Sequence, residues 1–137
     1  LIQLPENPAE SAESMNGALG GAEAVTLGGS RGRRGLVLSR LPAGDVDYYR
    51  FDLAAKDLVR VSCEAESAGS GVRGLSAEVR DANDQKLAGG AETALANLLT
   101  EPVEVPSAGT YYLRLSSATT EPLAIDPWVR CAVLINR

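Results

Sequence analysis

The sequence predicts an all-β domain, built as a sandwich or barrel of antiparallel strands. Apolar and polar residues alternate in a series of short runs, which is typical of strands with one buried and one solvent-exposed face. Clusters of Gly, Pro, Asn and Asp separate the runs, as turns require. The chain has 137 residues, of which 45% are hydrophobic and 23% charged, so it has the length and composition of one globular domain.

Strands are expected, in chain order, at residues 35–41, 46–53, 58–65, 75–81, 110–117 and 128–136. In the second run, the alternation places Tyr49, Phe51 and Leu53 on one face. Turns are expected at residues 41–45, 81–85, 88–90 and 106–109. The segment 91–105 is ambiguous, because its first half favours a helix and its second half suits an edge strand. Trp128 is expected to cap one end of the core.

The N-terminal part differs from the rest of the chain. Residues 1–22 are rich in Ala, Glu, Ser, Gly, Pro and Asn and show no strand alternation, so we predict an arm or linker there. The β-sandwich domain is expected to cover residues 23–137. The chain opens on Leu1 without a basic stretch followed by a long apolar run, so we expect it to be a piece of a longer precursor.

The charge balance limits the classes of partner. The chain carries 13 Lys and Arg against 18 Asp and Glu, a formal net charge of −5. Nucleic acid is therefore not expected as a partner, because phosphate binding needs clustered positive charge. The short cluster Arg31, Arg33 and Arg34 is expected to be a solvated loop. No apolar run approaches the roughly 20 residues of a membrane-spanning helix, so membrane insertion is not expected either.

The sequence offers no catalytic machinery. It contains no His, which removes the commonest general base at neutral pH and any His-supported triad. No Ser lies in a Gly-x-Ser-x-Gly elbow, and the segment 28–32 has neither a strand-to-helix context nor a partner base. We therefore predict that the domain is not an enzyme.

Asp45 and Asp47 are the best candidate metal ligands. They stand two residues apart at a turn leading into a strand, where alternate side chains point to the same side, so their oxygens could converge on one hard cation such as calcium. Calcium takes roughly six to eight oxygens, so other donors must join. The alternative is that Asp45 caps the turn and Asp47 accepts hydrogen bonds from backbone amides of the loop.

The chain has 2 cysteines, Cys63 and Cys131, and both fall on the expected inward faces of strands. An even count in an exported domain favours a disulfide. The alternative is that they are two buried free thiols, which pack as small apolar residues.

A pattern of Tyr and Arg repeats on two outward faces. Tyr48 and Arg50 stand two residues apart in one expected strand, and Tyr112 and Arg114 stand two apart in another. If those strands are neighbours, the four side chains form a flat aromatic and basic patch, and both residue types are enriched at binding hot spots. The alternative is that Arg stacks on Tyr only to cover the sheet.

Several motifs together resemble one known family. They are "GDVDYYRFDLAAKDLVRVSCEA" (44–65), "EVRDANDQKLAGG" (78–90) and "PSAGTYYLRLSS" (106–117), with "PENPAESA" (5–12) upstream. In this order they resemble the bacterial pre-peptidase C-terminal domain family. The family usually has Gly where this chain has Lys56. The resemblance implies a jelly-roll-like sandwich of two antiparallel sheets, and, if the arm folds back as in related collagen-binding modules, it adds Glu6 and Asn7 as calcium donors.

The expected function follows from the resemblance and from the absence of catalytic groups. Domains of this family are typically appended to secreted proteases and other exported bacterial proteins. We therefore expect a non-catalytic accessory module of a secreted or cell-surface protein, which aids binding, targeting or maturation. Its expected partners are other domains of the same precursor and an extracellular protein or polysaccharide polymer. The alternative is a structural spacer between domains, without a ligand.

Overall fold

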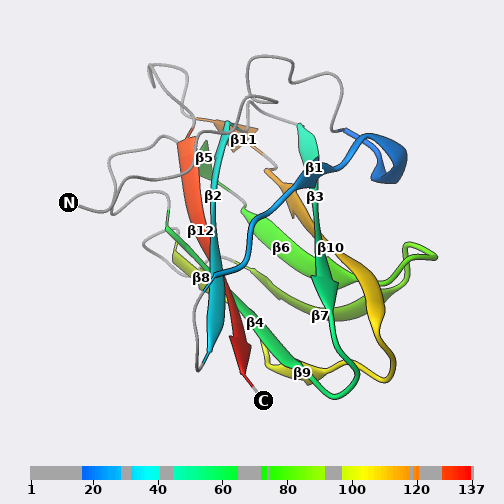
Figure 1. Cartoon of the computed structure of the whole chain (residues 1–137). Coiled ribbons are helices and arrows are strands. Elements are labelled where there is room, and N and C mark those ends of the chain that lie inside the picture. The colour runs from blue at the N-terminus through cyan, green and yellow to red at the C-terminus, as the bar shows by residue number, and fades with distance from the viewer. Residues whose placement is uncertain are drawn as a thin grey trace.

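The computed structural model describes residues 17–28, 32–40, 45–64, 72–73, 75–91, 97–117, 119–120 and 128–136. These residues form two β-sheets packed face to face, preceded by one short 3-10 helix, η2 (Leu19–Gly21) (Figure 1). The predicted all-β, two-sheet sandwich is confirmed. Within the described residues, no helix has the length and apolar character needed to cross a membrane.

The first sheet has the strand order β1-β3-β10-β6-β7. Its strands are β1 (Glu23–Ala24), β3 (Val46–Leu53), β10 (Gly109–Ser116), β6 (Ser76–Arg80) and β7 (Lys86–Ala91). β1 runs parallel to β3, and the other neighbouring pairs are antiparallel. The long central pair β3 and β10 therefore joins segments that lie far apart in the sequence.

The second sheet has the strand order β2-β12-β4-β8. Its strands are β2 (Arg33–Arg40), β12 (Trp128–Asn136), β4 (Leu58–Glu64) and β8 (Asn97–Leu99), and β9 (Val103–Glu104) pairs with the start of β4. A separate two-stranded ladder joins β5 (Val72–Arg73) and β11 (Thr119–Thr120). All the neighbouring pairs in these two sheets are antiparallel.

The core lies between the two sheets, and the alternation predicted from the sequence holds there. Phe51, Val61 and Leu113 are each at most 3% exposed. The buried inward residues of the first sheet include Tyr49, Phe51, Leu53, Ala77, Val79, Tyr111, Leu113 and Leu115. Those of the second sheet include Val37, Val59, Val61, Cys63, Val129, Cys131, Val133 and Ile135. The side chain of Trp128 lies outside the described residues, so its predicted capping role stays a prediction.

Two local predictions were wrong, and one ambiguous segment is settled in part. The turn expected at 88–90 lies inside β7. In the ambiguous segment 91–105, the second half contains the short strand β9, as suggested, whereas residues 92–96 of the first half lie outside the described residues. Arg33 and Arg34, expected in a solvated loop, are the first residues of β2. In each case a partner strand supplies the hydrogen bonds, which local propensity does not reveal.

The segment 23–28 forms backbone hydrogen bonds with both sheets. After β1, the amide of Val25 donates to the Arg50 carbonyl in β3 (2.8 Å). Three residues later, Gly28 exchanges two backbone hydrogen bonds with Arg34 in β2 (2.8 and 3.0 Å). The segment 23–28 therefore starts in the first sheet and ends in the second.

The turn between β3 and β4 is held by a buried carboxylate. Asp57 is 1% exposed, and its Oδ2 accepts hydrogen bonds from the Arg33 guanidinium and from the Ala54 amide, each at 2.8 Å. The Val105 amide donates to the Asp57 carbonyl (2.9 Å). Lys56, beside it, has a φ of +71°, in the left-handed region that favours glycine.

Gly90 shows why a glycine interrupts β7. A Cβ built on Gly90 would lie 2.8 Å from the Leu99 carbonyl oxygen, so the backbones of β7 and β8 approach closely there. Replacing Gly90 with Ala is expected to lower the free energy of unfolding by about 1–3 kcal/mol, because backbone must move. Urea denaturation measures this. Gly89→Ala is the matched control: its Cβ would clash with the flexible end of Lys86 and make ordinary contact with the Ala77 carbonyl oxygen at 3.5 Å, and an equal loss there would contradict the argument.

Candidate functional site

The structure brings the predicted Tyr and Arg residues together. β3 and β10 are neighbours, with Tyr112 directly opposite Arg50 and Arg114 directly opposite Tyr48. Their strand neighbours Tyr49, Phe51 and Leu113 point into the core, so these four side chains lie on the outer face of the first sheet. The patch was predicted on the condition that the strands pair, and they do.

The patch continues over β6 and β7. Arg80 lies opposite Tyr112, Glu78 lies opposite Arg114, and Lys86 lies opposite Arg80. We call the whole set the Tyr–Arg face; its members are Tyr48, Arg50, Glu78, Arg80, Asp84, Lys86, Tyr112 and Arg114. Sequence reasoning missed the β6 members, although Glu78 and Arg80 stand two residues apart in an expected strand and so had to share a face with each other.

Arg80 is held firmly by two carboxylates. Its Nε and Nη2 donate to Glu78 Oε1 (2.9 and 2.6 Å), and its Nη1 donates to Asp84 Oδ1 (3.1 Å). Burial lowers the pKa of the Arg80 guanidinium, but the hydrogen bonds and charges of Glu78 and Asp84 outweigh it and raise this pKa above its ordinary value. Arg80 is therefore a fixed structural cation in the middle of the face.

Within the described residues, the other cations of the face make no short hydrogen bond to a carboxylate. Arg114 Nη1 and Lys86 Nζ lie 3.7 and 3.9 Å from oxygens of Glu78, too far for a strong hydrogen bond. Arg50 is exposed, and its Nη1 donates to the Ala22 carbonyl. Each of these side chains keeps donors that can turn toward a ligand.

The two tyrosines of the face differ. Tyr48 is only 6% exposed, and its hydroxyl donates to the Asp84 carboxylate (3.2 and 3.3 Å). Tyr48, predicted as part of an outward binding surface, lies on the outer face but is covered there, because Asp84 in the turn after β6 accepts the hydrogen bond from its hydroxyl. Tyr112 is half-buried, and within the described residues its hydroxyl has no hydrogen-bond partner.

The two remaining tyrosines use their hydroxyls within the fold. Tyr49 donates to Ser39 Oγ (2.8 Å), and Tyr111 donates to the Ser107 carbonyl (2.6 Å). All 4 tyrosines of the sequence are thereby accounted for. Tyr112 stands apart as the one whose hydroxyl finds no partner in the described part of the chain.

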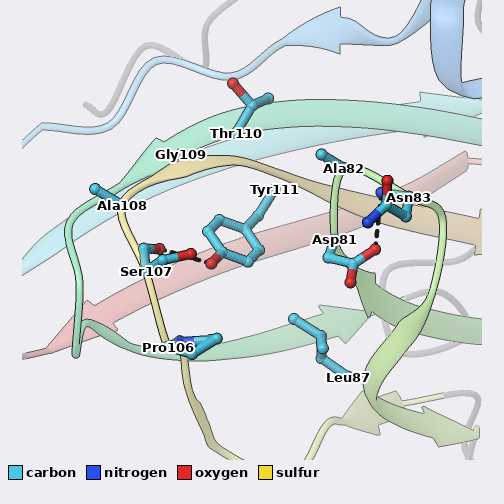
Figure 2. Close-up of a pocket in the computed structure, with 10 residues that line it drawn as sticks. All are labelled: Asp81, Ala82, Asn83, Leu87, Pro106, Ser107, Ala108, Gly109, Thr110 and Tyr111. Carbon is cyan, nitrogen blue, oxygen red and sulfur yellow. Dashed lines mark hydrogen bonds between the residues drawn. The ribbon is translucent and has the colours of Figure 1, made fainter.

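A hollow of about 210 Å³ lies where the turn after β6 meets the segment before β10 (Figure 2). It is lined by Asp81, Asn83, Leu87, Pro106, Ser107 and Tyr111, among others. The Asp81 carboxylate accepts from the amides of Asn83 and Gln85 (both 2.9 Å), so one wall is fixed by its own turn. The Tyr111 ring is only 5% exposed, so the hollow offers a ligand little aromatic surface.

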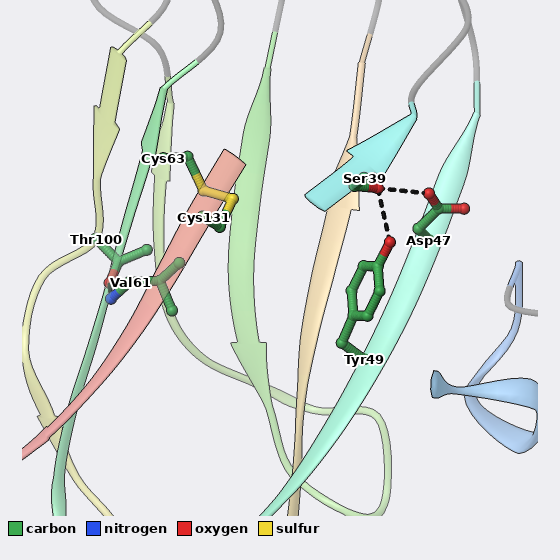
Figure 3. The surroundings of a disulfide bond; sticks show 7 residues. All are labelled: Ser39, Asp47, Tyr49, Val61, Cys63, Thr100 and Cys131. Carbon is green, nitrogen blue, oxygen red and sulfur yellow. Dashed lines mark hydrogen bonds between the residues drawn. A yellow bond between two sulfur atoms is a disulfide. The ribbon is translucent and has the colours of Figure 1, made fainter. Parts of the chain in front are cut away.

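Asp47, a predicted calcium ligand, lies in the core. It is 0% exposed, and its Oδ2 accepts from Ser39 Oγ (2.7 Å), which in turn accepts from the Tyr49 hydroxyl (Figure 3).

Asp45 precedes β3; its Oδ2 is buried and has no hydrogen-bond partner within the described residues. Glu6 and Asn7 lie outside those residues. Among the residues described, no cluster of three or more His, Cys, Asp or Glu is placed to hold a metal.

Calcium binding therefore stays a prediction, carried by the unsatisfied Asp45 oxygen. If calcium binds, a saturating concentration should raise the melting temperature of the parent chain by roughly 5–10 °C, because the ligand stabilises only the folded state. Asp45→Asn should melt like the parent without calcium and lose the shift with it. An unchanged melting temperature of the parent chain in calcium ends the hypothesis.

The predicted disulfide is confirmed. Cys63 in β4 and Cys131 in β12 are directly opposite each other, and their sulfurs are bonded at 2.06 Å (Figure 3). Both residues are at most 1% exposed, so the bond lies inside the core.

Comparisons with known proteins support the fold. No protein-family model matches the sequence, and no curated protein does. Among solved structures, PliG from Aeromonas hydrophila, a periplasmic inhibitor of g-type lysozyme, is 12% identical with a TM-score of 0.58, over 84% of this chain and 96% of that chain. The pre-peptidase C-terminal domain of a collagenase from Bacillus anthracis is 17% identical with a TM-score of 0.56, over 84% and 94%. PliG from Salmonella Typhimurium is 13% identical with a TM-score of 0.51, over 82% and 96%. At these identities the likeness shows a common fold, and the resemblance noted in the sequence is supported at that level.

Proposed function

We propose that the chain is a non-catalytic binding module of an exported bacterial protein, and that it binds its partner through the Tyr–Arg face. The structures that share this fold include an inhibitor of g-type lysozyme, which binds a protein, and a pre-peptidase C-terminal domain of a collagenase, which belongs to a larger protein. A buried disulfide fits an exported protein, because disulfides persist in oxidising compartments.

One observation carries the proposal. Tyr112, whose hydroxyl has no partner in the described residues, lies between Arg50 and Arg80 in one row across three neighbouring strands. Tyr and Arg are the residue types that most often dominate binding energy at an interface. On the outer face of the sheet, this hydroxyl can hydrogen-bond to water and exchange that water for a group of a ligand.

A binding panel tests the proposal. The full chain is applied to insoluble collagen, chitin, cell wall and acidic polysaccharide, and to g-type lysozyme in solution. Arg50→Ala and Tyr112→Ala should each weaken binding to the retained partner at least about tenfold, since removing a hot-spot side chain costs upward of about 1.4 kcal/mol.

Arg130→Ala is the matched control for Arg50→Ala. Arg130 is also an exposed arginine, but it lies on the outer face of the second sheet, where it pairs with Glu64. It should bind like the parent chain. If the chain binds no member of the panel, or if all three variants lose binding equally, the Tyr–Arg face is not the binding surface. The alternative of a structural spacer without a ligand is then favoured.

A further inference from the structure

The charge of the Tyr–Arg face is opposite in sign to that of the chain. The whole chain has a formal net charge of −5. On this face, however, four cations (Arg50, Arg80, Lys86 and Arg114) outnumber three carboxylates, which are Glu78, Asp84 and the exposed Asp52 two residues along β3 from Arg50. A local reversal of sign on an acidic domain concentrates negatively charged ligands at that surface.

Glu78 and Asp84 satisfy only part of this positive charge. They form short hydrogen bonds with Arg80 and thereby hold it in place. Within the described residues, Glu78 is also the only carboxylate whose oxygens lie within 4 Å of Arg114 Nη1 (3.7 Å) or Lys86 Nζ (3.9 Å). An incoming carboxylate can therefore bind Arg114 or Lys86 without breaking a strong bond. The exposed Arg50 can form a bidentate pair of hydrogen bonds with a carboxylate of the ligand.

The arrangement of the cations around Tyr112 limits the shape of the ligand. Arg50 and Arg80 flank Tyr112 on the two neighbouring strands, and Arg114 follows it two residues along β10. Neighbouring strands lie about 4.8 Å apart, so the flanking arginines start about 10 Å from each other. This is the scale of a disaccharide with a ring near Tyr112, Arg50 on one side of it and, on the other side, Arg80 with its bound carboxylates Glu78 and Asp84.

Tyr112 itself suits a sugar. Its ring can stack against the C–H face of a pyranose, and its unpartnered hydroxyl can donate to a sugar oxygen or accept from a sugar hydroxyl. These side chains lie on the outer face of a sheet, and an open face favours an extended polymer over a small molecule. We infer that the Tyr–Arg face binds an anionic polysaccharide that carries carboxylates, as in a uronic acid polymer; this rests on the proposed function.

The test uses polygalacturonate and a carboxyl-reduced, neutral form of the same polymer, with polyglutamate as the acidic peptide. The full chain should bind polygalacturonate at least about tenfold more tightly than the reduced polymer, and raising the salt from about 0.05 to about 0.5 M should weaken binding, because exposed charges are screened. Arg50→Ala and Arg114→Ala should each reduce affinity, and Arg130→Ala should not. Tyr112→Phe, which removes only the hydroxyl, should lose part of the affinity for the polysaccharide.

Equal binding of the neutral polymer, or binding insensitive to salt, would overturn the anionic assignment while the proposed binding face stands. Polyglutamate bound as tightly as polygalacturonate would overturn the sugar assignment. Retention of collagen, chitin or g-type lysozyme through the same residues, without polygalacturonate, would also overturn this inference and leave the binding module intact. Circular dichroism of each variant confirms that it is folded.

Discussion

Replacing Asp57 with Ala is expected to lower the free energy of unfolding by about 3 kcal/mol, because the buried carboxylate accepts hydrogen bonds from two donors, one of them the partly exposed Arg33 guanidinium. The carboxylate is 1% exposed and holds the Arg33 guanidinium and the Ala54 amide at 2.8 Å each. Its loss leaves the Ala54 amide without its acceptor and releases the start of β2 from the turn between β3 and β4. Urea denaturation followed by circular dichroism measures the change in midpoint.

The control for this prediction is an exposed ion pair in the same fold. Glu64 and Arg130 lie 2.7 Å apart, but their side chains are 47% and 48% exposed. Glu64→Ala should therefore cost less than about 1 kcal/mol, because exposed pairs are solvated and screened. If Asp57→Ala and Glu64→Ala cost the same, burial is not what gives the Asp57 pair its strength.

Removing the disulfide is expected to destabilise the domain by about 4 kcal/mol, because the bond closes a long loop and restricts the unfolded chain. Cys63 and Cys131 are separated by 68 positions in the sequence. The Cys63→Ala, Cys131→Ala double variant should keep its sheet spectrum and unfold at a lower urea concentration. The native chain, reduced and held reduced with a thiol reagent, should unfold near the same concentration.

The second measurement separates the covalent bond from the packing of its side chains. Reduction keeps both sulfurs in the core, whereas the Ala variant also removes their volume. A reduced chain as stable as the oxidised chain would show that the paired strands β4 and β12 already supply the restraint, and the loop argument would be wrong.

Alternation in the sequence was enough to predict the sandwich and the inward faces, because each strand needs only local sequence to show which side is apolar. It predicted Val61 and Leu113 as buried without knowing their neighbours. The same alternation placed Tyr112 and Arg114 on an outer face. It also put both cysteines inward, where the structure finds them bonded.

The parts that local sequence did not predict depend on contacts between distant segments. Nothing in the sequence near Tyr48 indicates that its hydroxyl will donate a hydrogen bond to Asp84, which lies 36 positions away. Gly90 looked like a turn residue, because the approach of the Leu99 backbone that requires it comes from the other sheet. Arg33 looked solvated, because its partner Asp57 lies in a turn 24 positions away.

The segment 23–28, which passes from one sheet to the other, also affects how the domain behaves in concentrated solution. By pairing with Tyr49 and Arg50 in β3 and with Arg34 in β2, it occupies backbone groups of these strands that would otherwise lie at open sheet edges. Open edges are where strands of separate molecules add to one another and start aggregates. At these positions, a second copy would first have to displace backbone that is already hydrogen-bonded, so strand addition to β3 and to the start of β2 is hindered there.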